Sequence, residues 1–597
     1  MDILRVVRIL GIASLVILGA ASSLPVLYLR GPTIPIPNVS YNPAPADRFH
    51  APLSSIGIIA IVNGTQYLTN PPPPAAVMVG STGTFPQKTG GAETIRQNTL
   101  RFTTDQSYFP QSETSLAVDP NNPNHIMGGF NDQKFFLCLF YIPSDCAGSY
   151  PASVSGFTIS NDGGKTVAKS GSLPDIMIGT NFLWSFGDPS VVATVDGNFF
   201  YSSLAFSPNG QNGVMLAKSM PNIFDSTVPC LTLLTFPTVN PCWDPVLVAG
   251  NLLSVPDSFE DKPLLAVDRD VASPFYGSVY VGWDHFLFNG FSQSYLARCD
   301  NNIMGNSSCV TVEGGDLPPL SGGDNFASFT TPVVDKNGNV YVTWCNYGTR
   351  VTYGPVFCRV RSSPPGGTSF GPATTILSFM GEGTTLPDAT VVIGWATEQF
   401  RAFSTPAIAV DTSSKSNNVY FTIQVCTTGH YMAIPRAVIP LLPGDNPGNC
   451  GASSVLFSKS ADGGRTWTAP VSVSEMAVND QPLVTVDSVT GNVYVLYYTT
   501  QYDQFNHRID VVASKSLDTG SRFRQIRVTS VSNEPDSDPN MYAYYAGGRG
   551  GSLTIPQYGD YFQATAIGGK LWVLFTANYA AQQGTFQTDP FLAVTIA

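Results

Sequence analysis

The same hairpin-forming unit recurs seven times along this 597-residue chain, and it constrains the fold more than any other feature. Each copy is a short apolar strand, a turn rich in Asp, Asn and Gly, and a second strand rich in Val, Tyr and Trp. The copies begin at Ser115, Asp188, Asp261, Thr330, Ser404, Asp480 and Gly559. A repeat of about 70 residues has room for four strands, and such units close into the blades of a β-propeller. The region is therefore predicted to be an all-β propeller.

Seven copies predict seven blades, or six if the weak copy at Gly559 only completes another blade. That last copy supplies one strand too few before residue 597. Closing the ring protects the edges of the sheets. An early segment, residues 94–102, is therefore expected to add the missing strand.

The amino-terminal residues have a different pattern. Arg5 and Arg8 precede an apolar run over residues 9–29, which is long enough to span a bilayer. Small residues at 19–23 suit cleavage by a signal peptidase. Residues 1–30 are therefore predicted to be a signal peptide or a membrane anchor helix, and both place the rest of the chain outside the cytoplasm.

The next segment, residues 31–94, is rich in proline and is predicted to be a semi-rigid stalk. Residues 95–597 then form the propeller domain. The whole chain is 12% charged and carries a net charge of −12. Since no basic patch is found, nucleic acid and anionic lipid surfaces are disfavoured as partners.

The ten cysteines fall into five pairs of near neighbours along the chain. An even count and short intervals in an exported chain favour disulfide bonds. The predicted pairs are Cys138 with Cys146, Cys230 with Cys242, Cys299 with Cys309, Cys345 with Cys358, and Cys426 with Cys450.

Two blades carry a further turn motif after the hairpin. It reads SNDGGKTV from Ser160 and SADGGRTW from Ser460, with weaker copies at 516–520 and 362–370. In this motif an Asp side chain bonds backbone amides of the turn, and the glycines adopt conformations that other residues resist. The residues expected to hold the turn are Asp162, Gly164, Asp462, Gly464 and Trp467.

The motif resembles the Asp box, or BNR repeat, of sialidase-like β-propellers. The resemblance implies that the Asp boxes are structural and lie on the face away from an active site. Sialidases use three arginines, a Tyr nucleophile with a Glu partner, and an Asp acid/base. This chain lacks the Phe/Tyr-Arg-Ile-Pro motif that carries the first arginine in that family. The arginines left without an assigned role are Arg298, Arg361, Arg401, Arg436, Arg508 and Arg549.

A candidate site follows from the direction of the strands. The first strand of each copy is innermost and ends in Asp at the hairpin turn, so its beginning must lie on the opposite face beside the central channel. That position is predicted to hold Glu113, Asp188, Lys262, Thr331, Thr405, Gln481 and Asp560, with Asp261 and Asp480 one residue earlier. The ends of the second strands reach the same face and add Asp132, Asp284, His285 and Asn346.

Glu113, Asp188 and Asp560 come from neighbouring blades, and converging carboxylates raise one another's pKa values. They are the candidate catalytic residues for general acid/base cleavage of a glycoside. The remaining residues of this face are candidate ligand-binding residues. The same oxygens could instead hold Ca²⁺, although no cofactor is required. A third alternative is that each residue only caps a loop at the start of a strand.

Three functions therefore stay open. The favoured one is an exported or cell-surface propeller that binds glycans or surface proteins without sialidase chemistry. The second is a sialidase-like glycoside hydrolase that uses the carboxylates. The third is a structural subunit of an extracellular assembly. The oligomeric state is not predicted.

Overall fold

The computed structural model describes most of the repeat region. The described residues are 93–94, 99–104, 110–132, 153–207, 209–228, 230, 240–253, 256–301, 309–313, 319–347, 353–382, 391–394, 404–428, 432–435, 452–504, 506, 508–533, 558–578, 581–582, 585–586 and 588–596. The predicted signal or anchor and nearly all of the predicted stalk lie outside them. Among the described residues, no helix has the length and apolarity needed to cross a membrane.

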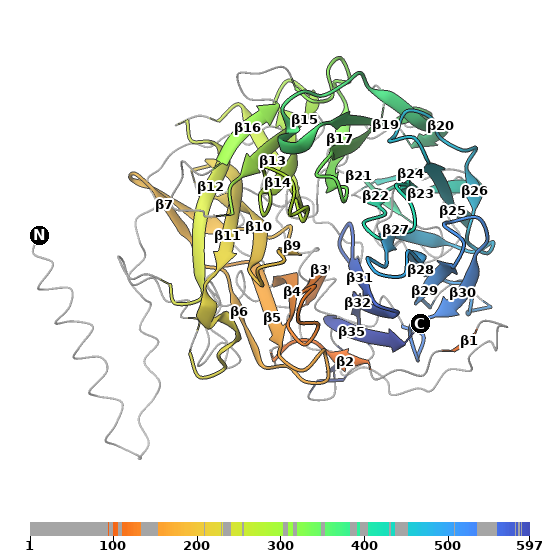
Figure 1. Cartoon of the computed structure of the whole chain (residues 1–597), viewed down its shortest axis with the longest axis horizontal. Coiled ribbons are helices and arrows are strands. Elements are labelled where there is room, and N and C mark those ends of the chain that lie inside the picture. Colours follow the sequence, from red (N-terminus) through yellow and green to blue (C-terminus); the bar gives the residue numbers. More distant parts are fainter. Residues whose placement is uncertain are drawn as a thin grey trace, which may run out of the picture. The chain divides into compact units, whose positions relative to one another are not determined.

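Seven sheets are arranged in a ring, so the predicted seven-bladed propeller is confirmed (Figure 1). Blades 1 to 3 share one plan, four antiparallel strands numbered outward from the channel. Blade 1 contains β3 (Gln111–Val118), β4 (Ile126–Asp132), β5 (Ser155–Ser160) and β6 (Lys169–Ser172). Blade 2 contains β9 (Ser190–Ala193), β10 (Phe199–Phe206), β11 (Asn212–Ser219) and β12 (Trp243–Asn251), and the hairpin of β7 (Ile176–Ile178) and β8 (Asn181–Ser185) extends it beside β10. Blade 3 contains β13 (Ser258–Val267), β14 (Val279–Leu287), β15 (Ser292–Cys299) and β16 (Cys309–Glu313).

Blades 4 to 7 follow the same plan, and two of them recruit an early strand. Blade 4 contains β17 (Ala327–Val334), β18 (Val340–Asn346), β19 (Tyr353–Ser363) and β20 (Thr374–Glu382). Blade 5 contains β22 (Pro406–Val410), β23 (Val419–Thr428), β25 (Ala452–Ser460) and β26 (Val471–Ser472). Blade 6 contains β27 (Asn479–Val486), β28 (Val493–Thr499), β29 (Asp510–Ser516) and β30 (Arg524–Arg527), with β1 (Glu93–Thr94) parallel to β30. Blade 7 contains β31 (Gln563–Ile567), β32 (Lys570–Ala577), β35 (Asp589–Ile596) and β2 (Leu100–Arg101).

Smaller elements lie in the connections. They are the pair β21 (Val391–Gly394) and β24 (Met432–Pro435), the pair β33 (Ala581–Gln582) and β34 (Thr585–Phe586), and two 3₁₀ turns at Pro221–Phe224 and Pro365–Gly367.

The early segment closes the ring as predicted. Strand β2 pairs antiparallel with β35, and the Arg101 guanidinium lies 2.6 Å from the carboxylate of buried Asp589. The next residue, Phe102, is fully buried in a cluster shared by blades 7 and 1, which includes Leu116, Trp572 and Leu592. Strand β2 and the last described strand, β35, therefore belong to a single blade.

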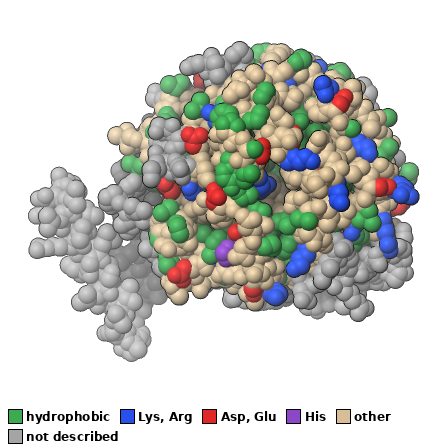
Figure 2. Space-filling view, in the orientation of Figure 1, with side chains coloured by type: hydrophobic (Ala, Val, Ile, Leu, Met, Phe, Trp, Pro, Cys, Tyr) green, Lys and Arg blue, Asp and Glu red, His purple; other side chains and the backbone are tan. Residues whose placement is uncertain are grey.

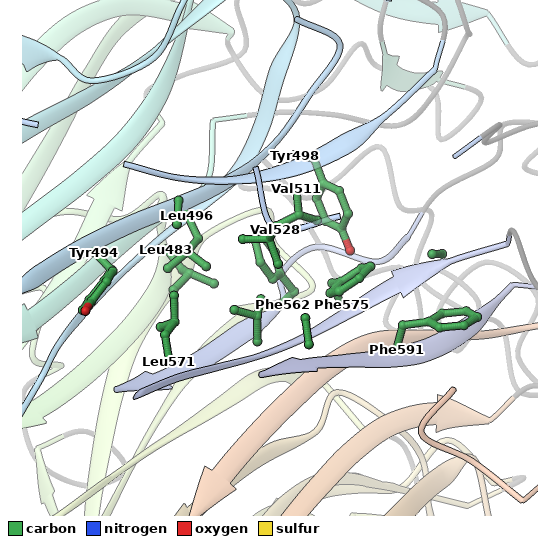
Figure 3. Close-up of a cluster of buried hydrophobic side chains, with 14 of the residues drawn as sticks. Leu483, Tyr494, Leu496, Tyr498, Val511, Val528, Phe562, Leu571, Phe575 and Phe591 are labelled. Atoms are coloured by element: carbon green, nitrogen blue, oxygen red, sulfur yellow. The ribbon is translucent and has the colours of Figure 1, made fainter. Parts of the chain in front are cut away.

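The hydrophobic core is divided among the interfaces between blades. Between blades 6 and 7, side chains of β28 and β29 such as Tyr494, Leu496 and Val511 face Leu571 and Phe575 of β32 (Figure 3). This arrangement explains why both strands of each hairpin are apolar, because a middle strand is covered by a neighbouring blade on each face.

Three predicted disulfides are confirmed. Cys299 with Cys309 and Cys345 with Cys358 join directly paired strand residues, and Cys230 bonds Cys242 at the start of β12. Cys426 is also disulfide-bonded. Its predicted partner Cys450 and the pair of Cys138 and Cys146 lie outside the described residues.

Candidate functional site

The two Asp boxes form the turns predicted for them. Oδ1 of Asp162 accepts hydrogen bonds from Ser160 Oγ, Lys165 N and Thr166 N at 2.8, 2.9 and 3.0 Å, and Oδ2 accepts one from the Thr166 hydroxyl at 2.7 Å. Burial opposes ionisation, but these four donors lower the pKa of Asp162 to about 2. The turn therefore holds an ionised carboxylate at its centre.

The second box repeats this geometry around Asp462. Its hydrogen bonds, that of the Thr466 hydroxyl first, lower the pKa of Asp462. Gly164 and Gly464 adopt positive φ angles of 90° and 80°. Trp467 packs against Phe421 and donates its indole N–H to the carbonyl of Gly464 at 3.1 Å.

The weak motif at 516–520 is a third complete box. Asp518 accepts hydrogen bonds from the Ser516 hydroxyl and from the amides of Ser521 and Arg522. The sequence underestimated it because Thr519 stands where the other boxes have Gly, yet Thr519 adopts the required positive φ of 56°. All three boxes follow third strands, so they lie on the face where the inner strands end. We call this the Asp-box face and the opposite one the mouth face.

The inner strands begin on the mouth face with a repeated irregularity. A residue with positive φ stands six positions before the turn residue in five blades, namely Glu113, Asp188, Lys262, Phe329 and Gln481. The pairing with the second strand shifts register beside four of them. These four are therefore β-bulges that turn a side chain out of the regular alternation, and Asp188 also has a positive φ just before β9.

The positive-φ positions correct two of the residues predicted at the starts of the inner strands, a set that we call the column. In blade 4 the equivalent residue is Phe329 and not Thr331, and in blade 7 the positive φ belongs to Gly559 and not to Asp560. The prediction aligned the Thr-Pro of blade 4 with the Lys-Pro and Gln-Pro of other blades, although its proline lies two residues later relative to the turn.

The predicted carboxylates of three blades do converge, and Lys262 lies among them. Its ammonium is 2.9 Å from Asp261 Oδ2, and it interacts electrostatically with Asp560, Asp284 and Asp188. Burial opposes the positive charge, but the attraction of Asp261 and then of the others raises the pKa of Lys262. We call these residues with Glu113 the mouth cluster.

Several cluster members cap bulges of adjacent blades. Asp284 accepts four hydrogen bonds, from the hydroxyls of Ser328 and Thr330 at 2.6 and 2.7 Å and from the amides of Phe329 and Thr330 at 2.8 and 3.0 Å. Burial raises the pKa of Asp284, while Lys262 and these donors oppose the rise. Glu113 accepts the amide of Asp560 at 2.8 Å and the side-chain amide of Asn131.

Two capping residues were missed by sequence reasoning. Asn131 accepts the amide of Asp188 at 2.8 Å, and Gln424 donates to Asp480 at 2.8 Å while its oxygen accepts Thr405. Both lie on second strands. Asn131 directly precedes the predicted Asp132, and Gln424 has the position in β23 that Asp284 has in β14. The alternation along those strands is the signal that could have found them. Gln481 in turn donates to the carbonyl of Gly559.

The mouth cluster is closed to solvent. The side chains of Lys262 and Asp261 are 0% exposed, and Glu113, Asp188, Asp284 and Asp560 are at most 1% exposed. Asp132 and Asp480 are buried as well. Among the described residues, no group of three His, Cys, Asp or Glu side chains is placed to share a metal ion. The geometry of the cluster is that of an internal network in which one ammonium attracts several carboxyl groups.

Tyr561 touches this cluster from blade 7 and was not predicted. Its hydroxyl donates to the carbonyl of Pro189 at 3.0 Å. Burial raises the pKa of Tyr561 well above its usual range, and the carboxylates of Asp188 and Glu113 raise it further. This is the opposite of an activated phenolate nucleophile. Of the arginines left without a role, Arg298 donates to the carbonyl of Gly366 and Arg361 to that of Leu320. Arg508 pairs with the carboxylate of Asp503.

A more accessible surface lies where β14 ends and β15 begins. His285 stacks on Tyr295 with ring centroids 4.6 Å apart, and Phe291, which is 39% exposed, lies 5.8 Å from Phe326. Gln293 stands between Phe291 and Tyr295 on the same face of β15 and is 3.5 Å from the Asn325 side chain. We call His285, Phe291, Gln293, Tyr295 and Asn325 the blade 3 aromatic surface.

Sequence reasoning found only His285 of this surface. The signal for the rest was the alternation of Phe291, Gln293 and Tyr295 directly after the Asn-Gly turn at 289–290. Asn346, also predicted, lies on the same face of the propeller in blade 4. Its amide donates to Asp324 at 3.0 Å, and Asp324 also accepts Trp344 at 2.9 Å and pairs with Arg359.

The Glu260–His285 pair predicts a pH dependence of stability. Burial disfavours the protonated ring, but the charge and hydrogen bond of Glu260 at 2.9 Å, helped by Asp257, raise the pKa of His285 above 6.5. A raised folded-state pKa gives a contribution that is complete below 6.5 and is lost as the pH rises through the folded-state value. The Tyr295 ring is the other titratable group that faces His285.

We therefore expect Glu260→Gln to cost about 1 kcal/mol more at about pH 6 than at about pH 9. Urea unfolding of both proteins at the two pH values measures this difference. Glutamine keeps an oxygen that can accept the hydrogen bond of the Trp283 indole N–H. Loss of that hydrogen bond therefore does not contribute to the difference. An equal cost at both pH values would contradict the assignment.

The closed ring and the three turns built around Asp162, Asp462 and Asp518 make the chain a seven-bladed β-propeller with Asp boxes. No protein-family model and no curated protein matches the sequence. Three solved structures have a similar course of the backbone. The chain is similar to a protein of unknown function from Dyadobacter fermentans, with a TM-score of 0.40 and 12% identity over 84% of this chain and 98% of that one.

The second is the Trypanosoma rangeli sialidase, with a TM-score of 0.34 and 12% identity over 70% of this chain and 57% of that one. The third is a Penicillium chrysogenum α-L-arabinanase, with a TM-score of 0.36 and 11% identity over 69% of this chain and 94% of that one. At such identities the chemistry has to be inferred from the residues of this chain itself.

Proposed function

We propose that this chain is an exported propeller that binds uncharged glycans through the blade 3 aromatic surface and does not hydrolyse them. The observation that carries the proposal is the combination of exposed or half-buried rings, Phe291, Tyr295 and His285, with the amides of Gln293 and Asn325. A sugar presents a face of C–H groups that packs on an aromatic ring, while its hydroxyls bond to side-chain amides.

The charge around this surface favours an uncharged glycan. Glu260 lies 2.9 Å from His285, Asp257 bonds Asn251 nearby, and Asp324 pairs with Arg359. The two basic groups at this surface, His285 and Arg359, are therefore each next to a carboxylate. A sialic acid carboxylate would meet no cluster of arginines among the described residues here, so neutral sugars are the better ligands.

Hydrolysis is disfavoured by the burial of the mouth cluster. Glu113 and Asp284 are committed to amides and hydroxyls of adjacent blades, and Asp261 to Lys262. A catalytic acid must reach the scissile oxygen of a bound sugar. The three disulfides support export, because such bonds persist in oxidising compartments.

The test compares glycan retention by the purified chain with that of Phe291→Ala. The matched control is Val471→Ala on β26, where an apolar residue is 51% exposed in another blade. We expect neutral oligosaccharides of a glycan array to bind the natural chain, and Phe291→Ala to weaken binding by about tenfold, as the loss of an aromatic contact and its buried area predicts. Val471→Ala should bind like the natural chain.

Three other results would overturn the proposal. Retention confined to sialylated glycans would contradict the preference for uncharged sugars. Sugar release detected by mass spectrometry, and abolished in a Glu113→Gln and Asp188→Asn double variant, would make the chain a glycoside hydrolase with its site at the mouth cluster. No retention together with polymerisation of the purified chain would support a structural subunit.

A further inference from the structure

A cavity of about 300 Å³ runs along the axis of the propeller and is lined by all seven blades. Seen along the axis, the ring has a hollow at its centre (Figure 2). Its wall mixes aliphatic side chains such as Leu265 and Leu483 with Thr331, Thr485 and Gln563. All seven blades also begin with a strand that is paired on one side only. The free edges of those strands turn backbone N–H and C=O groups toward the axis.

One charged side chain lines this cavity, Arg269, directly after β13 at the Asp-box end. Its Nε and Nη2 donate to the carbonyl of Ala193 at 3.2 and 2.7 Å, which holds the guanidinium plane in place. A guanidinium has five N–H groups, so three remain. No described residue accepts them, and no described carboxylate pairs with Arg269.

The chain has 42 acidic and 30 basic residues, and carboxylates are therefore in excess. Five described arginines pair with carboxylates, namely Arg101, Arg359, Arg508, Arg522 and Arg527, whereas Arg298, Arg361 and Arg465 donate to backbone carbonyls as Arg269 does. Solvent in the channel reaches Arg269, but the surrounding protein lowers its pKa to about 10. It is therefore charged at neutral pH, in a cavity that offers it no counter-ion.

We infer that the axial channel is a binding site for a small hydroxylated carboxylate such as a hexuronate. The carboxylate accepts two parallel hydrogen bonds from Nη1 and Nη2 at the remaining end of the Arg269 guanidinium, a geometry that gives strong paired hydrogen bonds. The cavity holds about ten water volumes, which is enough for one sugar ring. The hydroxyls of the ring bond to the threonines, to the Gln563 amide and to the free strand edges, and its C–H groups contact the aliphatic side chains.

This site is independent of the blade 3 aromatic surface, since it lies on the axis and takes an anion. The test is calorimetric titration of the purified chain with glucuronate, with glucose as its uncharged counterpart and octanoate as a carboxylate without hydroxyls. We expect glucuronate to bind at least about tenfold more tightly than either.

Arg269→Gln should lose at least about tenfold in glucuronate affinity. Arg465→Gln removes an exposed arginine from an Asp box, where Arg465 bonds its own turn, and should leave the affinity unchanged. If Arg269→Gln unfolds at a lower urea concentration than the natural chain, Ala564→Leu provides a second variant. It narrows the channel without touching Arg269 and should also weaken binding.

Equal affinity for glucuronate and glucose, or glucuronate binding that survives both channel variants, would overturn the inference. Binding of octanoate in preference to glucuronate would overturn the hydroxylated ligand. Inorganic phosphate that competes with glucuronate at equal concentration would reduce the site to a general anion site and overturn its specificity. Phe291→Ala should leave glucuronate binding intact, so this proposal and the proposed function fail separately.

Discussion

Replacing Lys262 by Met is expected to destabilise the folded chain by about 3 to 5 kcal/mol. The ammonium is 0% exposed, lies 2.9 Å from Asp261, and balances the charges of Asp188, Asp284 and Asp560. Methionine fills a similar volume and keeps the contact with the rings of Phe286 and Phe329. The loss is therefore electrostatic, because it leaves several carboxylates buried without their cation.

The sign of the pH dependence checks this interpretation. Without Lys262 the folded-state pKa values of the carboxylates rise further above their unfolded values, as burial already does for Asp284. Folding then takes up protons, so the deficit of the variant should be largest at neutral pH and should shrink as the pH falls toward about 4. Urea unfolding midpoints across that range measure it.

The matched control is Lys570→Met, which removes an exposed lysine at the start of β32. Its effect should stay within about 0.5 kcal/mol at every pH. A loss for Lys262→Met below about 1 kcal/mol, or one independent of pH, would mean that the carboxylates of the mouth cluster are protonated in the natural chain.

The second large effect is expected for Phe102→Ala, which should cost about 3 to 5 kcal/mol. Phe102 is fully buried and follows the strand that closes blade 7, and its amide donates to Pro590 at 2.8 Å. Its ring packs with Leu116 of blade 1 and Leu574 of blade 7. Truncation leaves a cavity where the early strand β2 joins β35 to complete blade 7.

Urea unfolding followed by tryptophan fluorescence measures this loss, and Trp572 lies in the same cluster as a local probe. Val310→Ala, at a position that is 55% exposed on β16, is the control and should be nearly neutral. An effect of Phe102→Ala as small as the control would show that blade 7 is stable without the closing strand.

Much of the fold could be predicted because its signals are local. The seven hairpins, the closing segment at 94–102 and the disulfides at Cys230, Cys299 and Cys345 all follow from short-range pattern and spacing, and all are confirmed. The predicted column of inner-strand residues matches the positive-φ positions in blades 1, 2, 3 and 6, whereas Thr405 of blade 5 has no positive φ. It failed in blades 4 and 7 because a bulge changes the register without a distinct sequence signal.

The candidate site was harder to predict. Counting residues along the inner strands placed Asp188, Lys262 and Asp560 on one face, and in the structure they lie close enough to interact. It could not tell that they face one another inside the protein, since a channel-facing and a buried carboxylate have the same place in the repeat. It also missed Tyr295 and Gln293, whose partners His285 and Asn325 come from other strands.

The sequence by itself determined the class of protein: strand alternation and turn chemistry act over a few residues, and they recur often enough to define a seven-bladed Asp-box propeller. The tertiary structure alone decided which polar residues are accessible. Burial depends on the neighbouring blade, often hundreds of residues away, as for Glu113 and Asp560. For the same reason only the assembled ring places Arg269 at the wall of the central cavity, where no described carboxylate pairs with it.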